Sequence, residues 1–503
     1  METVIIDGGP LTPEQVATVA FGRARAVAAD DLDDRLAPAR QVVDAAVESE
    51  DVVYGITTGF GALATTHIGR SEAEALQYNL VRSHATGVGE PIPDEVVRAM
   101  LLLRARTLAM GHSGVRPVVV RKLLELLDRG ILPVVPSQGS VGASGDLAPF
   151  AHLSLPLIGE GLVRRADVVT PTAETGFEPI ELLTKEGLSL LNGTEGMTAM
   201  GAIALHHARN IALAADAAAA LSVEALLGSA RPFRPEIHAL RPHPGQVASA
   251  ARIAALIQGS GIIASHTNDF HHAVQDAYSL RCAPQVHGAV ADTLDHMRHV
   301  LTIEMGSLVD NPIVFAGSGE VLSGGNFHGE PLALVCDFAT IAVAELASIS
   351  ERRTDRMLDP ARSEGLPPFL ASNPGVESGY MITQYVQAAL VAENKVLAHP
   401  ASVDSVPTSG GQEDHVSMGW GAARKLLQVV SNVRRVVAIE ILCAAQAIGY
   451  RAPLDPGAGS ARVVAAVRER VPPLDGDRSH AGDIETVADM IENGEIASLT
   501  SSL

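Results

Sequence analysis

Long apolar segments in the second half of the chain predict helices. Ala202–Leu227 is rich in alanine, carries few charges and stops before Gly228, a residue type that often ends helices. Pro331 suits a first helical position, and the apolar pattern after it runs to Leu358, just before Asp359 and Pro360. We therefore expect two long helices here, the first with its C-cap at Gly228.

A third segment, Ser417–Tyr450, carries apolar residues on nearly every helical face. A helix of this kind either spans a membrane or is surrounded by other helices. Arg434, Arg435 and Glu440 interrupt the segment, which favours the second alternative. Segments this long and this apolar predict a helix bundle at the centre of an oligomer.

The first part of the chain has a different pattern, in which glycine-rich polar loops separate shorter apolar stretches. We place a soft boundary near residue 200, with no linker and no internal repeat to mark it. The expected organisation is a loop-rich N-terminal part, residues 1–200, and a long-helix bundle part, residues 201–503. The fold class is mainly α.

Composition and charge narrow the function classes. Of 503 residues, 47% are apolar and 19% are charged, as in globular proteins. The net charge of −21 argues against nucleic acid as a partner, because phosphates would be repelled. The N-terminus lacks a basic region, and we see no run of about 18 predominantly apolar residues. A cytoplasmic protein without a membrane segment is expected.

Cysteine and histidine offer no obvious metal or disulfide framework. Cys282, Cys336 and Cys443 are odd in number and far apart. The pairs His206-His207 and His271-His272 have neither metalloprotease spacing nor a companion cluster. We predict no metal site.

One serine lies among unusually small residues. "GSVGASGDLAPFAHLSLPLIGEG", from Gly139 to Gly161, nearly spells the GxSxG nucleophile elbow of hydrolases, but Asp146 stands at the last glycine position. Pro133 and Pro136 also interrupt the strand that such an elbow requires. The hydroxyl of Ser144 is therefore not expected to be a hydrolase nucleophile.

Further polar loops recur along the chain, and each admits an ordinary structural explanation. Tyr54 could be a packed turn residue, Tyr278 and Arg281 could form a cation–π contact at i,i+3, and Glu413 could belong to an acidic helix N-terminus. The motifs that carry these residues, in chain order, are "YGITTGFG", "NGTEGM", "VQDAYSLRCAPQVHGA", "DNPIVF", "SGGNFHGEP" and "PTSGGQEDHVSM".

Together with the segment around Ser144, these motifs resemble those of the aromatic amino acid ammonia-lyases, in family order over roughly residues 10 to 500. The resemblance implies a mainly α fold of the fumarase/aspartase type. It also implies a homotetramer whose sites combine loops from three subunits.

The resemblance further implies an internal cofactor and no external one. In the family, Ala-Ser-Gly cyclises and dehydrates to a 4-methylidene-imidazol-5-one group, abbreviated MIO. Here the backbone nitrogen of Gly145 would attack the carbonyl carbon of Ala143, and Ser144 would become a dehydroalanine. A side chain at position 145 would obstruct this closure, and a helix starting after Asp146 would direct its positive end at the ring.

The family's site residues map onto this chain as follows. Tyr54 takes the place of the catalytic base, and Arg281 that of the clamp on the substrate carboxylate, for which its planar fork is suited. Tyr278 and Asn192 correspond to residues that orient the substrate and the MIO oxygen. Gln275 and Phe327 are expected to line the same pocket.

Two positions indicate the substrate. The pair Ser83-His84 and the acidic Glu413 resemble the histidine-specific members of the family. A carboxylate facing a benzene ring would be a buried charge without a partner, whereas an imidazole offers it an N–H group. We predict that L-histidine is converted to trans-urocanate and ammonia, the first step of histidine degradation.

Two alternatives stay open at this stage. One is a tyrosine or phenylalanine ammonia-lyase, or a 2,3-aminomutase, of the same family; the other is an inactive helical scaffold. Thr58, Glu195 and Gly410-Gly411 depart from the commoner family motifs. None of them is assigned to chemistry, so we expect them to affect loop stiffness.

Overall fold

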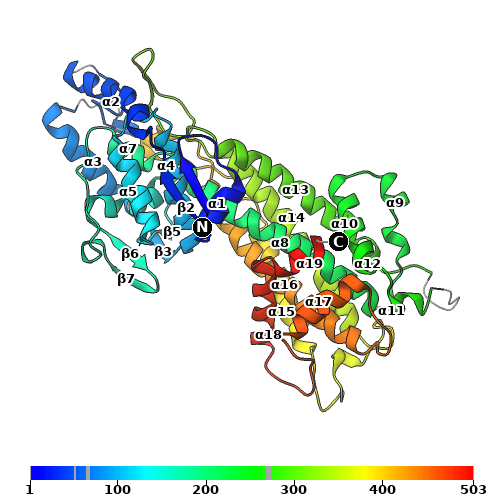
Figure 1. The fold of residues 1–503 in the computed structure, drawn as a ribbon. Coiled ribbons are helices and arrows are strands. Elements are labelled where there is room, and N and C mark those ends of the chain that lie inside the picture. The colour runs from blue at the N-terminus through cyan, green and yellow to red at the C-terminus, as the bar shows by residue number, and fades with distance from the viewer. Residues whose placement is uncertain (1, 50–51, 60, 64–67, 268–273, 502–503) are drawn as a thin grey trace. The chain divides into compact units, whose positions relative to one another are not determined.

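The structure is a computed structural model that describes residues 2–49, 52–59, 61–63, 68–267 and 274–501. The chain forms two compact units (Figure 1). The first comprises residues 1–206, 298–337 and 400–424, and the second 207–297, 338–399 and 425–503. Each unit is assembled from three stretches, whereas the parts expected from the sequence were contiguous. That expected functional division stays a prediction.

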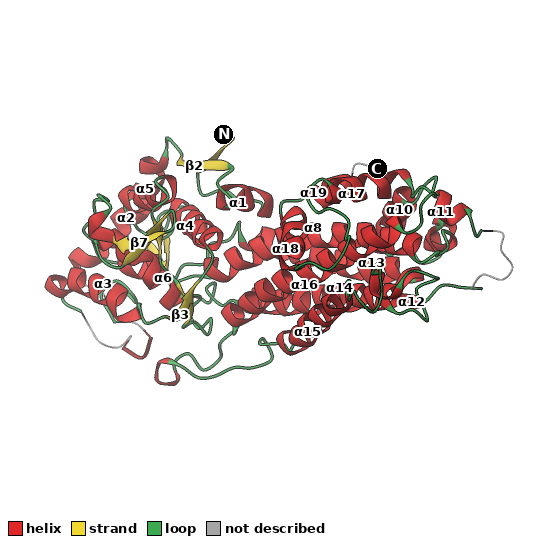
Figure 2. Cartoon of the chain, turned by 90° about the horizontal axis from the view of Figure 1, so that it is seen from below, coloured by secondary structure: helices red, strands yellow, loops and turns green. Residues whose placement is uncertain are grey.

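The first unit contains short strands in four small sheets, around which helices pack (Figure 2). The parallel pair β1–β2 aligns Glu2 with Ala24, and the other sheets are antiparallel. The strands are β1 (Glu2–Ile6), β2 (Ala24–Ala28), β3 (Val88–Pro91), β4 (Leu132–Pro133), β5 (Pro136–Gln138), β6 (Leu162–Arg165), β7 (Val168–Pro171), β8 (Ile313–Phe315) and β9 (Glu320–Leu322).

The helices of the first unit position the site. The capping box of Thr12 and Gln15 begins α1, and α4, buried over most of its length, packs against α1 and α5. Another group, α3, α6 and α7, packs together. The helices that lie wholly in this unit are α1 (Pro13–Ala20), α2 (Leu32–Ser49), α3 (Arg70–His84), α4 (Asp94–Ala109), α5 (Pro117–Asp128), α6 (Leu147–Ser154) and α7 (Glu186–Leu191).

The second unit contains helices joined by loops, and none of the described strands belongs to it. In it α10 packs against α9, α17 and α19, and α18 packs against α19. Its own helices are α9 (Pro235–Ala239), α10 (Pro244–Leu256), α11 (Gly261–Ala264), α12 (Tyr278–Arg281), α15 (Met381–Leu397), α17 (Ala458–Arg468), α18 (Ala481–Glu492) and α19 (Glu495–Ser501).

Four long helices contribute residues to both units: α8 (Glu195–Ala225), α13 (Ala283–Glu304), α14 (Glu330–Leu358) and α16 (Gly419–Gly449). Their bounds confirm the predicted helices 331–358 and 417–450 to within two residues and the predicted helix 202–227 at its C-terminal end, although α8 begins seven residues earlier than predicted, at Glu195. The mainly α fold class is confirmed. The predicted cap at Gly228 is wrong by one residue. Leu227 takes the left-handed conformation, with φ of 51°, and the Gly228 N–H donates to the carbonyl of Val223 at 2.7 Å.

Helix α16 is surrounded by other helices, as its apolar faces predicted. Its Glu440 carboxylate is buried, pairs with the guanidinium of Arg353 on α14, and accepts the hydroxyl of Ser222 on α8 at 2.6 Å. The side chain of Gln387 on α15 donates to the carbonyl of Val436 at 2.7 Å. The charges inside this apolar helix are therefore neutralised by its neighbours.

Helix α14 shows that the sequence inspection overlooked one apolar run. Among the described residues it alone is long and apolar enough to cross a membrane by length and composition. Of its most apolar window, 61% is buried within the structure, as in the core helix of a soluble protein. The paired, buried Arg353 lies in the same helix.

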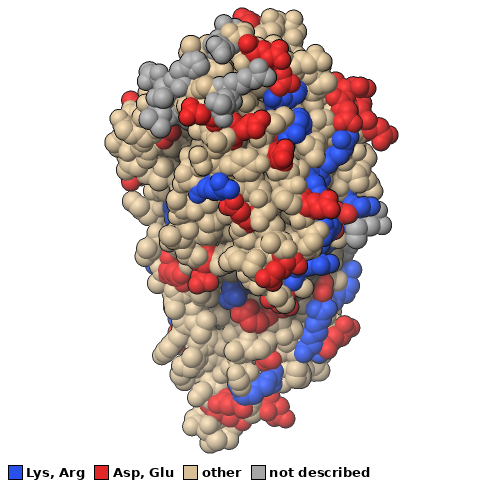
Figure 3. All heavy atoms as spheres, turned by 90° about the vertical axis from the view of Figure 1, so that its left-hand side faces the viewer, with Lys and Arg blue, Asp and Glu red and all other residues tan. Residues whose placement is uncertain are grey.

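The surface distributes its charges in pairs. On the face drawn in Figure 3, acidic and basic side chains are interspersed. Exposed ion pairs such as Arg25–Asp128 at 2.5 Å and Arg121–Asp33 at 2.6 Å belong to the first unit. The net charge of −21 is thus not gathered into one acidic patch on this face.

Candidate active site

A cavity of about 480 Å³ in the first unit brings five of the predicted site residues together. These are Tyr54, His84, Ser144, Asn192 and Glu413. The loop after α2, the end of α3, the loop before α6, the end of α7 and the loop before α16 supply them. Apolar side chains of α3 and α7 complete the wall, namely Leu76, Leu80, Leu188 and Leu191.

The backbone around Ser144 is tightly folded. Gly142 and Gly145 have φ of 68° and 74°, in the left-handed region that glycine tolerates. A Cβ at Gly145 would lie 1.9 Å from the carbonyl oxygen of Gly193. The Asp146 N–H donates to that same oxygen at 2.8 Å, and α6 begins directly afterwards at Leu147, as predicted. Glycine is therefore required at position 145 on steric grounds alone.

Asp146 is buried directly beside this segment. Its carboxylate accepts the N–H of Met197 at 2.8 Å and the hydroxyl of Ser140 at 3.2 Å. Burial raises the pKa of Asp146 to about 7, although the two hydrogen bonds lower it in part. The group thus holds the start of α8 against the loop that carries Ser144.

Glu413 and His84 face the cavity from different elements. The Ser144 hydroxyl donates to Glu413 Oε1 at 3.4 Å, and the Thr408 hydroxyl donates to Oε2 at 2.6 Å. His84 Nδ1 lies 2.8 Å from the Leu80 carbonyl oxygen, so Nδ1 carries the proton in that hydrogen bond. Burial lowers the pKa of His84, although the Leu80 carbonyl and the nearby Glu413 oppose the shift. The neutral ring therefore offers Nε2 as an acceptor.

Asn192 is held in place by buried polar groups. The Arg104 guanidinium donates to the Asn192 carbonyl at 2.9 Å and pairs with Glu195 at 2.6 Å. Asn192 Nδ2 donates to the carbonyl of Asn311 at 3.3 Å. Its Oδ1 is buried and has no hydrogen-bond partner among the described residues. That oxygen is a buried acceptor without a partner beside the cavity.

A buried ion pair supports the same helix. Lys185 has φ of 73° and begins α7, and its ammonium donates to Asp310 at 3.1 Å and to the Ser189 hydroxyl at 2.8 Å. Asp310 also accepts the N–H of Asn311 at 2.8 Å. Lys185 and Asp310 are fully buried, so each neutralises a charge that would otherwise be costly.

Comparisons with known proteins show which family this chain is similar to. The profile of the aromatic amino acid lyase family matches residues 11–469. A histidine ammonia-lyase from Anaeromyxobacter sp. (strain K) is 52% identical over 508 residues, covering 98% of this chain and 99% of the relative.

Two solved structures are also similar. The tyrosine aminomutase from Streptomyces globisporus has a TM-score of 0.93 and 41% identity, covering 99% of this chain and 98% of the other. The histidine ammonia-lyase from Trypanosoma cruzi has a TM-score of 0.91 and 43% identity, covering 100% of this chain and 95% of the other.

The chain belongs to the aromatic amino acid lyase family. Its fold is the fumarase-like helical fold of that family, and it is a carbon–nitrogen lyase. Family members use the MIO group. The segment from Ala143 to Gly145 fits this group. The close approach of Gly193 and the left-handed φ of Gly145 require glycine at position 145, and closure of the MIO ring requires glycine at the same position.

Four residues that the lyase motifs assign to the site do not line this cavity. Gln275, Tyr278 and Arg281 belong to the second unit. Tyr278 is 72% exposed, and the Arg281 guanidinium lies 4.6 Å from the centroid of its ring, so the cation–π contact considered as the ordinary explanation of this pair is present. Phe327 belongs to the first unit, in the loop before α14, outside the lining of the cavity.

Sequence inspection missed the buried polar supports. Arg104 lies in the apolar run "MLLLRARTLAM", and an arginine there signals a buried partner, which is Glu195. The departure at Thr58 also has a structural role, since its hydroxyl accepts the Gly55 N–H at 3.2 Å and donates to the Gly59 carbonyl at 3.0 Å. It tightens the loop that carries Tyr54.

One group of potential metal ligands lies among the described residues. Ligand atoms of His328, Glu330 and His415 lie within 4.8 Å of one another. His328 Nδ1 accepts the N–H of Glu330 at 3.3 Å, which leaves the proton of the neutral ring on Nε2 and opposes metal binding there. The rings of His206 and Phe21 are in contact, with centroids 5.0 Å apart and planes tilted by 46°. The pair His271-His272 lies outside the described residues.

Proposed function

We propose that this lyase eliminates ammonia from L-histidine to give trans-urocanate, the first step of histidine degradation. The observation that carries the proposal is the meeting of Glu413 and His84 on the cavity that contains Ser144. Relatives of 50–53% identity named histidine ammonia-lyase support it. We expect the enzyme to act in the cytoplasm.

The substrate ring is recognised by two acceptors. The Glu413 carboxylate accepts one imidazole N–H, and Nε2 of neutral His84 accepts the other when the substrate ring is protonated. The leucine side chains of α3 and α7 pack against the ring faces and exclude water. A benzene ring would leave both polar groups unpaired.

The catalytic part of the cavity is proposed to form from Ala143, Ser144 and Gly145. The MIO group made from them supplies an electrophile that activates the substrate for loss of its amine. Tyr54, on the same cavity, removes the β-proton. Asn192, which lines the same cavity, orients the substrate.

The carboxylate of the substrate requires a cation, and no lysine or arginine is among the described residues that line the cavity. We assign this role to Arg281, with Tyr278, Gln275 and Phe327 beside the substrate, and infer that they reach the site from other subunits of a homotetramer. The exposure of Tyr278 in the single chain leaves it free for such a contact.

The test combines product and covalent structure. Purified protein incubated with L-histidine should develop the ultraviolet absorbance of urocanate. The peptide spanning Ala143 to Gly145 should be lighter than its sequence mass by two water molecules. In Ser144→Ala, both the urocanate absorbance and the mass loss of the peptide should disappear while the protein stays folded. An unmodified peptide from fully active enzyme would contradict the proposed cofactor but leave the substrate assignment intact.

A second candidate activity is a tyrosine 2,3-aminomutase, favoured by the similarity to the Streptomyces globisporus structure. Incubation with L-tyrosine followed by chromatography would detect β-tyrosine. We expect none, because the Glu413 carboxylate would face an aromatic ring that has no N–H group.

A further inference from the structure

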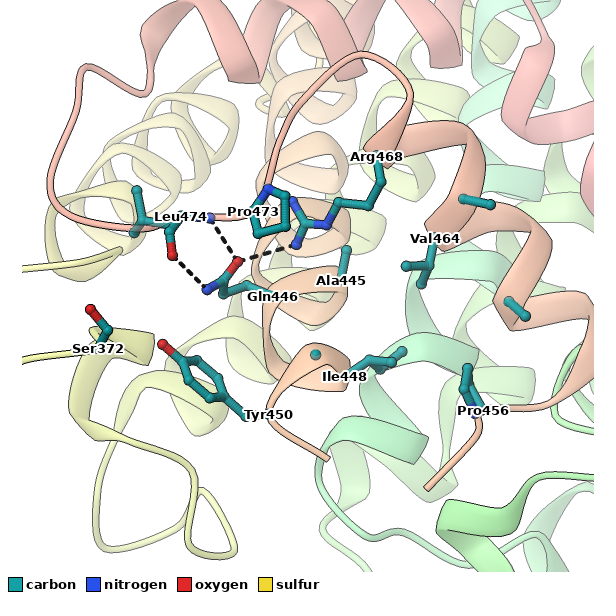
Figure 4. Close-up of a pocket in the computed structure, with 13 residues that line it drawn as sticks. Ser372, Ala445, Gln446, Ile448, Tyr450, Pro456, Val464, Arg468, Pro473 and Leu474 are labelled. Atoms are coloured by element: carbon teal, nitrogen blue, oxygen red, sulfur yellow. Dashed lines mark hydrogen bonds between the residues drawn. The ribbon is translucent and has the colours of Figure 1, made fainter. Parts of the chain in front are cut away.

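A second cavity, of about 630 Å³, lies in the second unit. It is formed by the last turns of α16, the loop that follows them, helix α17 and the segment Pro473–Leu474 (Figure 4). None of its lining residues lines the cavity that contains Ser144. Its volume is within the range of small-molecule sites.

The walls of this cavity are mostly aliphatic. Ala445 and Ile448 come from α16, Ala461 and Val464 from α17, and Pro456 from the loop between these helices. In Figure 4, Ile448, Val464 and Pro456 lie along one side, and Tyr450 lies apart from them near Ser372. Such walls favour an apolar ligand body.

One end of the cavity carries a cation. The Arg468 guanidinium donates to the Val471 carbonyl at 3.3 Å and to Gln446 Oε1 at 3.2 Å. Both acceptors are neutral, and the phenol of Tyr380 is beside it. Among the described residues no carboxylate forms an ion pair with Arg468, since the nearby Asp483 is paired with Arg478 at 3.0 Å. Burial lowers the pKa of Arg468, and the neighbouring Tyr380 and Asp483 oppose this shift.

The guanidinium is held in a defined position. Gln446 accepts the Leu474 N–H at 3.0 Å as well as the Arg468 N–H, and it donates to the Leu474 carbonyl at 3.2 Å. Arg478 in turn donates to the carbonyls of Pro472 and Pro473 at 2.8 Å and 3.1 Å. The segment that closes this end is therefore tied down, and the remaining N–H groups of Arg468 are pre-oriented for an anion.

We propose that this cavity is a binding site for a small monocarboxylate with an apolar body. The carboxylate would form the direct ion pair that Arg468 lacks among the described residues, and the body would occupy the space between α16 and α17. A guanidinium suits a carboxylate because two parallel N–H groups match its two oxygens. Such a ligand would be an effector rather than a substrate, because no residue assigned to catalysis lines the cavity.

The experiment uses 1-naphthaleneacetate, which is fluorescent, with the full-length protein. Fluorescence anisotropy should show saturable binding at up to low millimolar concentration. The neutral isostere 1-naphthaleneacetamide should bind at least tenfold more weakly, since a charge-assisted pair is lost. Arg468→Met, which keeps the length of the side chain, should weaken binding of the acid tenfold and leave that of the amide unchanged.

Three further variants locate the site. Ala461→Trp should abolish binding by filling the cavity, whereas Arg462→Met, an exposed neighbour on α17, should have no effect. Glu413→Gln, in the other cavity, should retain full affinity for naphthaleneacetate even though turnover falls. Equal affinity in wild type and Arg468→Met, or loss of binding in Glu413→Gln, would overturn the proposal. So would a change of oligomeric state in Ala461→Trp on size-exclusion chromatography, because the cavity would then accommodate another copy of the chain.

Discussion

Glu413 and His84 present two hydrogen-bond acceptors to the cavity that holds Ser144. The His84 ring donates through Nδ1 to Leu80 and is kept neutral by burial, so only its Nε2 lone pair faces a ligand. An imidazolium ring has two N–H donors to match, and a phenyl ring has none. At the residue scale, therefore, these two side chains set the preference for a substrate.

This preference can be weakened by removing the charge of Glu413 and the acceptor of His84. In the double variant Glu413→Gln with His84→Leu, kcat/KM for L-histidine should fall and some cinnamate should form from L-phenylalanine. An unpaired buried polar group costs about 1–3 kcal/mol, so the ratio of the two kcat/KM values should move tenfold to a hundredfold. If the ratio does not move toward phenylalanine, these residues do not recognise the ring, although the chain would still be a lyase.

Asp146 should make stability depend on pH. Its pKa in the folded protein is raised to about 7, so between roughly pH 4 and pH 7 the folded protein holds a proton that the unfolded chain has lost. Stability must therefore fall as pH rises through this window, by up to about 1.4 kcal/mol per pH unit.

The isosteric Asp146→Asn variant provides the control, because an amide can accept from Met197 and donate to Ser140 in the same geometry. Unfolding free energies measured by urea titration at several pH values should fall between about pH 4 and pH 7 in the wild type and not in Asp146→Asn. Parallel curves for the two proteins would mean that Asp146 is charged when folded.

At the scale of elements, the segment before α6 and the junction of α7 with α8 form one unit of packing. Gly145 and Asp146 pair with Gly193, Asn192 ends α7, and Arg104 of α4 ties this junction to Glu195. The positions of Ser144 and Asn192 in the cavity therefore depend on each other.

Gly145→Ala tests this packing. A Cβ at this position would lie 1.9 Å from the Gly193 carbonyl oxygen, so backbone must shift, and we expect activity and thermal stability to be lost together. Gly130→Ala is the matched control, with φ of 60° and no atom within 4 Å of the added Cβ. Its cost should be limited to the left-handed backbone, about 1–2 kcal/mol. Similar melting temperatures for the two variants would argue against a close contact at Gly145.

At the scale of the whole molecule, the predicted site residues are divided between the two units. Tyr54 and Ser144 belong to the first, and Tyr278 and Arg281 to the second. The proposed homotetramer would bring residues of both groups together from different subunits.

Complementation between inactive variants would test this assembly. Tyr54→Phe and Arg281→Met should each be nearly inactive alone, the second through loss of the carboxylate clamp. When the two chains are co-expressed and mixed oligomers are isolated through two affinity tags, some sites should receive both intact residues and activity should return. Mixed oligomers as inactive as the separate variants would place Tyr54 and Arg281 of each site in the same chain.

The amino-acid sequence determined the long helices, the segment that begins α6 and the chemical types at the site. Helices α14 and α16 follow from local periodicity, because an apolar surface on many faces must be buried whatever the remaining topology. The motif residues could be assigned from resemblance, since reaction chemistry requires particular side chains at particular spacings.

Only the tertiary structure decided the contacts between distant segments. Nothing local to Leu227 indicates that it, rather than Gly228, adopts the left-handed conformation. The pairing of Lys185 with Asp310, the raised pKa of Asp146 and the shared cavity of His84 and Glu413 all arise between segments far apart in the chain. Burial and electrostatics depend on every neighbour in space, whereas periodicity depends only on neighbours along the chain.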